Sequence, residues 1–303
     1  MGKPDCSVQV DAGMVETLPF TEFILVFGQL AVLVFVVCSM LAMGLTLTVP
    51  QIIAPLKDIR MVVLALLANF VLVPAVALLI LVAFPLSEGL TIGLLIVALS
   101  AGAPFLPKLA QITRGDPAFS VGLMVLLMVV TIGYLPLVLP LALTGVTISA
   151  WDIARSLIFL MLLPLVVGLV VRARYEEVAE SVAPVMSQAS GLALVVLLVA
   201  FFVGYFPDLV GVVGSTAILA SVLFLLAAFA IGYLLGGRDG ATKRVMGLGT
   251  AQRNLGAATA VAGLNFTDPD VLVMVLVVGL VGLVLLMVIG GELGRRAGGG
   301  GLR

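Results

Sequence analysis

The chain is a succession of long apolar stretches separated by short polar segments rich in glycine and proline. About 20 consecutive apolar residues are enough for a helix to cross a hydrocarbon layer of roughly 30 Å. The pattern predicts nine membrane spans, at residues 22–48, 61–84, 88–112, 117–144, 151–171, 184–206, 213–236, 242–264 and 270–291. Pro74, Pro136, Pro140 and Pro164 lie inside unbroken spans and predict kinks packed against neighbouring helices.

Two of the spans are interrupted at corresponding places. The third span breaks at Ser100–Lys108, which contains Pro104 and Pro107, and the eighth breaks at Gly247–Asn254. A break frees backbone groups that lipid cannot satisfy, so it persists only where protein or a water-filled cavity receives it. Paired breaks in two halves of a chain are typical of a transporter's binding site. The two basic residues expected at membrane depth, Lys108 and Arg253, both lie in these breaks.

The composition agrees with a membrane protein. Of the 303 residues, 62% are hydrophobic and 10% charged, and the mean hydropathy is +1.33. Soluble domains contain about 25% charged residues. The alternation typical of a membrane β-barrel is absent, so the fold class is all-α.

The basic residues predict the orientation through the positive-inside rule. Lys3 and Arg155 fall on one side, which places the N-terminus outside and the C-terminus in the cytoplasm of a cell inner (plasma) membrane. We expect residues 1–20 to form an extracytoplasmic tail and residues 292–303 a cytoplasmic one, the Gly-rich end being disordered from Gly290. The opposite, cytoplasmic side holds Lys57, Arg60, Arg114, Arg172, Arg174, Arg238, Lys243, Arg244, Arg295, Arg296 and Arg303.

Missing residue types narrow the chemistry. The chain has no histidine and two cysteines, which argues against a metal site, a histidine proton relay and a disulfide framework. All acidic residues fall in tails, loops or span ends, so an intramembrane enzyme with paired acids is not expected. The net charge of −1 gives no sign of a nucleic-acid partner.

The third span runs from outside to inside and the eighth from inside to outside, each followed by one further span. This layout predicts an inverted-topology repeat in which the two broken helices cross near the midplane. Half-helix ends and freed carbonyls would then meet at one place.

Three stretches resemble motifs of the bile acid:sodium symporters. Leu41–Thr48 resembles their "GMGL(T/S)L", Thr113–Ser120 their "A(R/K)G(N/D)xAxS", and Gln252–Ala258 lies where they carry "(M)QNSGLA". The resemblance, to the apical sodium-dependent bile acid transporter type, implies a transmembrane domain over 21–291 with nine helices. It implies a core of 61–144 and 213–291, and a panel of 22–48 and 151–206.

The same resemblance implies where two sodium ions would bind, and most of the ligands there are changed. The glutamate shared by both sites corresponds to Gly249, and the glutamine near it to Arg253. Asn254 and Ser120 are kept, whereas a threonine is replaced by Met124. A glutamine of the second span corresponds to Asn69. The serine–asparagine pair of the first broken helix corresponds to Leu106 and Pro107.

A guanidinium about 5 Å from Na⁺ would cost roughly 3 kcal/mol at an effective dielectric constant of about 20. We therefore expect both sodium sites to be lost, with Lys108 and Arg253 acting as built-in cations that also help to hold an anion. Two structural alternatives remain open: Lys108 extends to the cytoplasmic interface, and Arg253 ties down carbonyls freed by the break.

The sequence thus predicts a secondary transporter of small organic anions, such as bile acids, oxoacids or similar carboxylates, working by alternating access without sodium or another cofactor. The expected partners are the substrate and the lipid bilayer. Uniport, exchange and proton coupling through Lys108 remain open, as does a sodium-coupled symporter with rebuilt sites. The candidate crossover residues are Lys108, Arg253, Asn254, Gln252, Thr250, Pro104 and Pro107.

Overall fold

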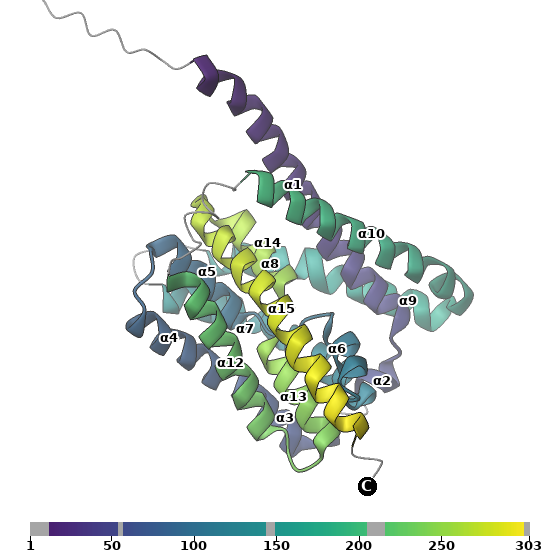
Figure 1. Ribbon diagram of the computed structural model, residues 1–303. Helices are drawn as coiled ribbons and strands as arrows, with labels where there is room; N and C mark the ends of the chain where they lie inside the picture. Colours follow the sequence, from purple (N-terminus) through teal and green to yellow (C-terminus); the bar gives the residue numbers. More distant parts are fainter. Residues whose placement is uncertain (1–11, 54–56, 144–148, 205–215, 300–303) are drawn as a thin grey trace, which may run out of the picture.

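The computed structural model describes residues 12–53, 57–143, 149–204 and 216–299, and these residues form helices joined by short connections (Figure 1). The helices are α1 (Ala12–Thr46), α2 (Val49–Ile53), α3 (Ile59–Leu67), η2 (Ala68–Leu72), α4 (Val73–Ala83), α5 (Glu88–Leu99), α6 (Leu106–Ile112), α7 (Pro117–Ala142), α8 (Ala150–Leu157), η3 (Ile158–Leu162), α9 (Leu163–Arg174), α10 (Glu176–Gly204), α12 (Thr216–Leu235), α13 (Gly240–Ala251), α14 (Leu255–Asn265) and α15 (Pro269–Gly299). No strand occurs among them, which confirms the predicted all-α class.

Six helices of the described chain are long and apolar enough to cross a membrane: Ile59–Ala83, Pro117–Ala142, Ala150–Arg174, Glu176–Leu197, Thr216–Leu235 and Pro269–Gly298. Each coincides with a predicted span. The described apolar part of the first predicted span is shorter, at Leu30–Thr46, and the third and eighth are each divided into two shorter helices. The chain is therefore a multi-pass membrane protein, and the count of nine spans stays a prediction.

Side chains at the ends of the spans determine where several helices begin. The Asp116 carboxylate accepts the Phe119 N–H at 3.0 Å at the start of α7, and Asp239 accepts the Thr242 N–H at 2.8 Å at the start of α13. A cap of this kind satisfies one of the N–H groups that a helix leaves free at its first turn. The polar separators of the sequence are thus the residues that start the spans.

The two predicted tails are helical over most of their described length. α1 begins at Ala12, within the segment expected to be an extracytoplasmic tail, and residues 1–11 lie outside the described part. α15 continues to Gly299, past the point where we expected disorder. The reason is packing: a Cβ on Gly298 would lie 2.8 Å from Arg114 Cζ, so glycine lets the last turns of α15 approach the turn after α6.

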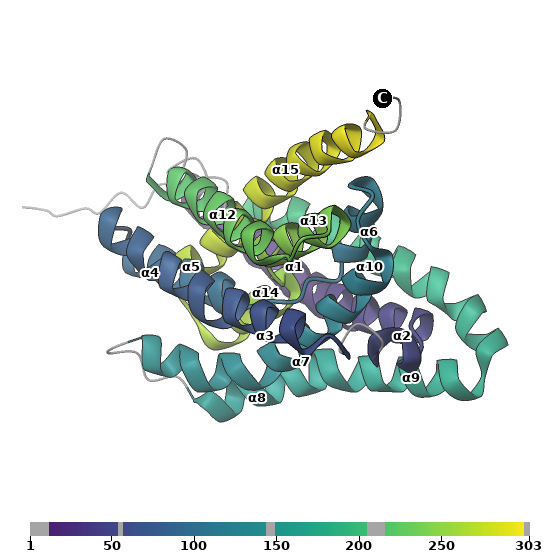
Figure 2. The same cartoon turned by 90° about the horizontal axis from the view of Figure 1, so that it is seen from below.

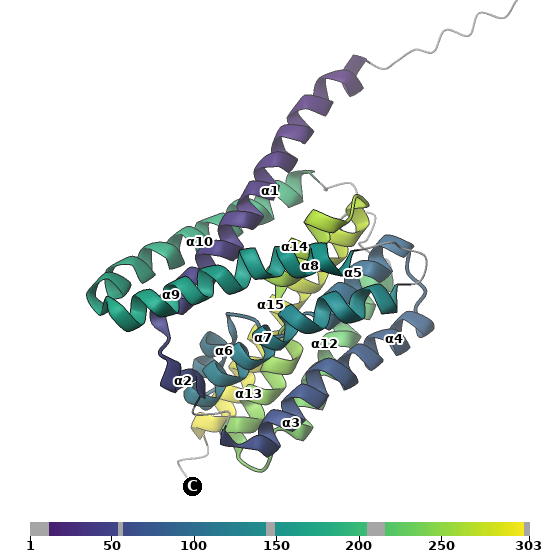
Figure 3. The same ribbon diagram turned by 180° about the vertical axis from the view of Figure 1, so that it is seen from behind.

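The helices form two groups. α12 packs on α4, α13 and α15, while α5 packs on α15, α4 and α7, so these helices form one packed group. To one side, α1 lies against α9 and α10 (Figure 1). Viewed from below and from behind, α8 and α9 form one long rod that runs from the first group to the second (Figures 2 and 3).

Two membrane-spanning segments contain a five-residue π turn that ends one residue short of a proline: Val73 separates η2 from Pro74, and Leu163 separates η3 from Pro164. Since proline has no N–H to donate, the helical ladder loses a bond there, and a π turn is one way to absorb the loss. The expectation of kinks at Pro74 and Pro164 thus takes a specific form in the structure.

Candidate functional site

The third predicted span is interrupted between α5 and α6, at Ser100–Phe105. Gly102 has φ +82°, and a Cβ on it would lie 2.6 Å from the Cα of Met128 in α7. Only glycine tolerates both this backbone conformation and this approach. The adjoining Ala101 is held by Thr131, whose hydroxyl donates to the Ala101 carbonyl and accepts from its N–H, both at 3.0 Å. The break is therefore a bonded element of the core.

The eighth predicted span is interrupted between α13 and α14, at Gln252-Arg253-Asn254. Asn254 joins this break to the first one: its N–H donates to the Ser100 carbonyl at 2.9 Å, and its Nδ2 donates to the Gly102 carbonyl at 3.0 Å. Its Oδ1 accepts the Ala257 N–H at 3.0 Å and so caps α14. The two broken helices therefore meet at their breaks.

Arg253 occupies the point where the C-terminal ends of α5 and α13 come together. Nε donates to the Val97 carbonyl at 3.2 Å, and Nη2 to the Ala98 carbonyl at 2.6 Å. Nη1 donates to the Thr250 carbonyl at 3.1 Å and to Asn69 Oδ1 at 2.9 Å. These carbonyls carry the negative end of two half-helix dipoles, so the guanidinium both satisfies and neutralises them.

Burial makes this arrangement significant. Arg253 is 3% exposed and is the one charged side chain that is buried among the described residues. Its donors are directed at protein oxygens, which matches the sequence alternative of a tie on freed carbonyls. The fixed cation and the tie are therefore the same group.

Asn69 reaches the crossover from the π turn η2. Its Nδ2 donates to the Ala65 carbonyl at 3.0 Å and to Thr250 Oγ1 at 3.3 Å, while its Oδ1 accepts from Arg253. The predicted residues Arg253, Asn254, Thr250 and Asn69 thus form one buried network.

Tyr134 is a member of this region that the sequence did not reveal. Its hydroxyl donates to the Phe70 carbonyl at 2.6 Å, and its ring lies edge-on to that of Phe70, with centroids 4.7 Å apart. It therefore fixes the π turn that carries Asn69. The only local signal was Pro74, which predicts a disturbed ladder without naming the residue that repairs it.

The positions matched to sodium ligands are apolar or already bonded. A Cβ on Gly249 would lie 2.8 Å from Leu106 Cδ2 and 3.0 Å from Leu123 Cδ2, so leucine side chains fill the place of a longer residue. Met124 is buried, at 1% exposure, and the Ser120 hydroxyl donates to the Pro117 carbonyl at 2.7 Å. Around Gly249 the structure therefore presents methyl groups rather than oxygen ligands of the kind that Na⁺ prefers.

The remaining candidates lie at the edge of the network. Lys108, in the first turn of α6, is exposed, and its ammonium makes no ion pair within the described part of the chain. Pro104 and Pro107 are half-buried beside it. Gln252 Oε1 is buried without a hydrogen-bond partner, although the residue as a whole is partly exposed. The Gln252 amide oxygen, an acceptor, and the Lys108 ammonium are thus two polar groups of this region without a protein partner among the described residues.

Comparison with known proteins places these features in a family context. Residues 31–212 match the model of the Sodium Bile acid symporter family. The chain is 27% identical over 239 residues to the "Probable sodium/metabolite cotransporter BASS2, chloroplastic" of Oryza sativa subsp. japonica, which covers 77% of this chain and 57% of the relative. It is 25% identical over 235 residues to the "Probable sodium/metabolite cotransporter BASS1, chloroplastic" of Arabidopsis thaliana, covering 76% and 58%. The chain thus spans less than two thirds of the length of these relatives.

Proposed function

The chain belongs to the Sodium Bile acid symporter family, and from this membership we propose that it is a secondary transporter of small organic anions that works by alternating access and does not need sodium. The observation that carries the proposal is the buried Arg253 guanidinium, which donates to α5 and α13 carbonyls and to Asn69. A bound Na⁺ would neutralise such oxygens in a sodium-coupled relative. Here a covalently attached cation performs that task in every state of the protein.

The surroundings of Gly249 support the loss of sodium coupling. A carboxylate at this position would need the space that Leu106 and Leu123 occupy, and a bound Na⁺ would lie close to a fixed positive charge. The names of the plant relatives favour the alternative, a sodium-coupled metabolite symporter with ligands drawn from elsewhere. Sodium dependence of transport decides between the two.

The substrate class follows from the sign of the charge at the crossover. None of the carboxylates in the described, burial-classified part of the chain is buried there, so a small anion is the complementary solute. Because Arg253 is engaged with protein oxygens, we assign the anion-contacting role to the exposed Lys108. The overall arrangement would be nine spans with inverted halves, the N-terminus outside and the C-terminus in the cytoplasm.

Purified protein in proteoliposomes tests this function. Taurocholate, pyruvate and pantoate are first screened by thermal shift, and uptake of a stabilising anion is then measured with Na⁺ or with choline on both sides. We expect equal uptake in the two salts. Uptake that stops in choline would overturn sodium independence in favour of the symporter, and no stabilisation or uptake of any of the three would count against the anion class.

Two variants sharpen the assignment. Lys108→Gln should reduce uptake at least tenfold while leaving the melting temperature unchanged; Lys108→Arg is the charge-preserving control. Normal uptake by Lys108→Gln would instead mean that the ammonium only extends to the interface. The triple variant Gly249→Glu, Leu106→Ser, Arg253→Gln returns a carboxylate and removes the cation, and it should gain a Na⁺-dependent rise in melting temperature.

A further inference from the structure

The segment from Ala150 to Arg174 is a single rod in which a π turn separates two α-helical halves. The rod comprises α8, η3 and α9, and it runs from beside α7 and α14 to the start of α10 (Figures 2 and 3). Each half packs on a different set of helices. The π turn lies between the two sets.

The N-terminal half belongs to the packing of the crossover helices. α8 lies against α7 and α14, and α14 is the helix that Asn254 caps. Ile153 and Leu157 point into this contact and are fully buried. α8 is thus attached to the helices that carry the candidate site.

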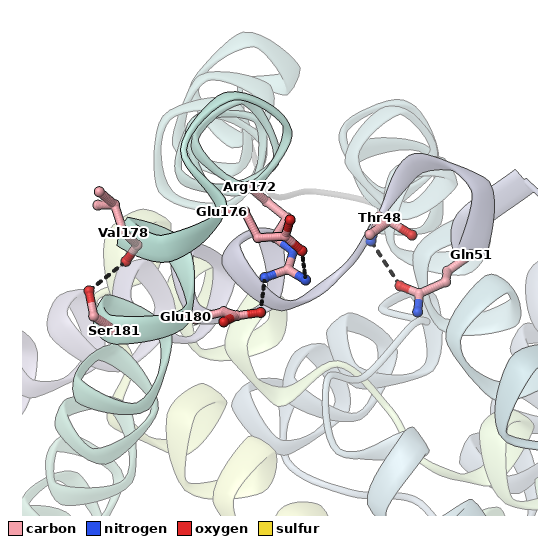
Figure 4. Close-up of polar contacts among 7 residues, drawn as sticks. All are labelled: Thr48, Gln51, Arg172, Glu176, Val178, Glu180 and Ser181. Carbon is pink, nitrogen blue, oxygen red and sulfur yellow. Dashed lines mark hydrogen bonds and ion pairs between the residues drawn. The ribbon is translucent and has the colours of Figure 1, made fainter.

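The C-terminal half is attached to α1 and α10. Gly44 of α1 and Gly168 of α9 face each other: a Cβ on Gly168 would lie 2.8 Å from the Cα of Gly44, so the two backbones are in direct contact. At the end of α9, Arg172 pairs with Glu176 at 2.9 Å and with Glu180 at 3.1 Å, both in the first turns of α10 (Figure 4). We name α1, α9 and α10 the panel helices; this set leaves out α8, which the resemblance had included in the panel of 22–48 and 151–206.

The backbone is weakest at the point where the rod changes partners. The Leu163 N–H donates to the Ile158 carbonyl across the π turn, and the next residue, Pro164, has no N–H. Sharp bends in helices occur at such places, because the ladder of hydrogen bonds is interrupted. Phe159 in this turn is 60% exposed, whereas Met161 is buried toward the neighbouring helices, so the turn is held by packing on one side only.

The other π turn shows what a restrained version looks like. In η2, the Phe70 carbonyl accepts the Tyr134 hydroxyl and the Asn69 side chain is bonded on both sides, and Ala68, Asn69 and Phe70 are all buried. No side chain of another described helix donates to a carbonyl of η3 among the hydrogen bonds of the structure. The π turn before Pro74 is therefore held by hydrogen bonds from other segments, and we call it locked; the π turn before Pro164 has no such bond among the described residues, and we call it unlocked.

We propose that η3 and Pro164 form the pivot about which the panel helices move relative to the crossover helices, α8 remaining with the crossover and α9 with the panel. The inference rests on the proposed alternating access, which requires two groups of helices to change their relative position. It places the boundary between them inside one continuous helix. Motion about such a point bends the rod without breaking the Gly44–Gly168 contact or the Arg172 ion pairs.

Distances between spin labels on either side of η3 test the proposal. In a chain with Cys6→Ser and Cys38→Ser, a label at Leu234→Cys in α12 is paired with a label at Trp151→Cys in α8 or at Val170→Cys in α9, all three sites being exposed. In lipid nanodiscs we expect one narrow distance for the 151–234 pair and two populations for the 170–234 pair. The panel pair Val170→Cys with Leu192→Cys should give one distance.

Two populations in both pairs to residue 234 would mean that the whole rod moves and would overturn the pivot, as would a single distance in both. Pro164→Ala restores a donor to the ladder and should remove the second population of the 170–234 pair, whereas the matched Pro74→Ala in the locked turn should leave it. The 151–234 and 170–234 distances measured with Pro164 in place decide the question even if Pro164→Ala fails to fold. Sodium-dependent uptake would overturn the proposed function and leave these distances untouched, so the two failures are distinguishable.

Discussion

Arg253 donates from Nη2 to the carbonyl of Ala98 at 2.6 Å, which joins the end of α13 to the end of α5, 155 positions apart in the chain. Hydrogen bonds to a charged donor are stronger than neutral ones, and here they are also buried. The crossover therefore depends on one side chain that reaches four oxygens at once.

Arg253→Lys should destabilise the protein although it keeps the charge. A lysine ammonium has three donors on a flexible stem, so it cannot reproduce the fork that serves Val97, Ala98, Thr250 and Asn69. We expect a loss of about 2–4 kcal/mol, measured by thermal unfolding in detergent. Arg60→Lys, at an exposed position, is the control and should be neutral; equal melting temperatures of the two variants would contradict the tie.

Gly249→Ala should overpack the crossover. Its new methyl would lie 2.8 Å from Leu106 Cδ2 and 3.0 Å from Leu123 Cδ2, and overpacking a rigid core costs about 1–3 kcal/mol. Leu106→Ala removes the methyl groups in question, so the double variant should recover part of the loss. A double-mutant cycle of melting temperatures measures the coupling, and strictly additive effects would show that the two residues do not touch.

Asn254→Asp separates the two tasks of this side chain. The carboxylate still accepts the Ala257 N–H and caps α14, but it cannot donate to the Gly102 carbonyl and would instead repel it. Asn254→Ala loses both bonds. We expect both variants to be destabilised by about 1–3 kcal/mol, while hydrogen exchange rises at the start of α14 only in Asn254→Ala. Equal exchange there in both variants would argue against the cap.

Tyr134→Phe removes one hydroxyl and keeps the ring contact with Phe70. The π turn then loses the donor to its Phe70 carbonyl, which should cost about 1–2 kcal/mol. The same variant should weaken any Na⁺-independent transport because Asn69, presented by that turn, holds Arg253. Tyr233→Phe, with its ring stacked on Phe229, is the matched control. Unchanged stability of Tyr134→Phe would show that the π turn η2 does not depend on the hydrogen bond from Tyr134.

The start of α13 should respond to acid. Hydrogen bonds from the Thr242 N–H and hydroxyl hold the pKa of Asp239 below its usual value, so its ionised form is favoured in the folded state. Such a group adds stability at neutral pH, and this contribution is lost as the pH falls through the lowered pKa. The melting-temperature difference between the native protein and Asp239→Ala should therefore shrink in acid. Ser149→Ala, which removes an uncharged cap from α8, should show a difference that does not depend on pH.

The sequence by itself determined where this chain enters and leaves apolar surroundings and where its helices fail. The apolar runs that follow Asp58, Asp116 and Asp239 are helices, and each of these residues caps the start of its helix. A span needs uninterrupted backbone hydrogen bonding, and the cap satisfies an N–H group at its first turn. The position of the first break followed from its glycine and prolines, whereas Gly247 and Gly249, which suggested the second break, are helical in α13, and that break begins only at Gln252. The expected disorder after Gly290 was wrong, because a glycine-rich composition says little about a helix that packs closely on a neighbour.

Only the tertiary structure decided what each break binds. Arg253 could face lipid, an anion or the ends of two helices, and the approach of α5 to α13 selected the last of these. Tyr134 and Thr131 repair the backbone from α7, at positions that no local pattern distinguishes from packing residues. Whether the carbonyls of a π turn are hydrogen-bonded likewise depends on the neighbouring helix; in η2 the Tyr134 hydroxyl of α7 donates to the Phe70 carbonyl. Local sequence sets which backbone groups lose their partners, and the packing of distant segments sets which side chains replace them.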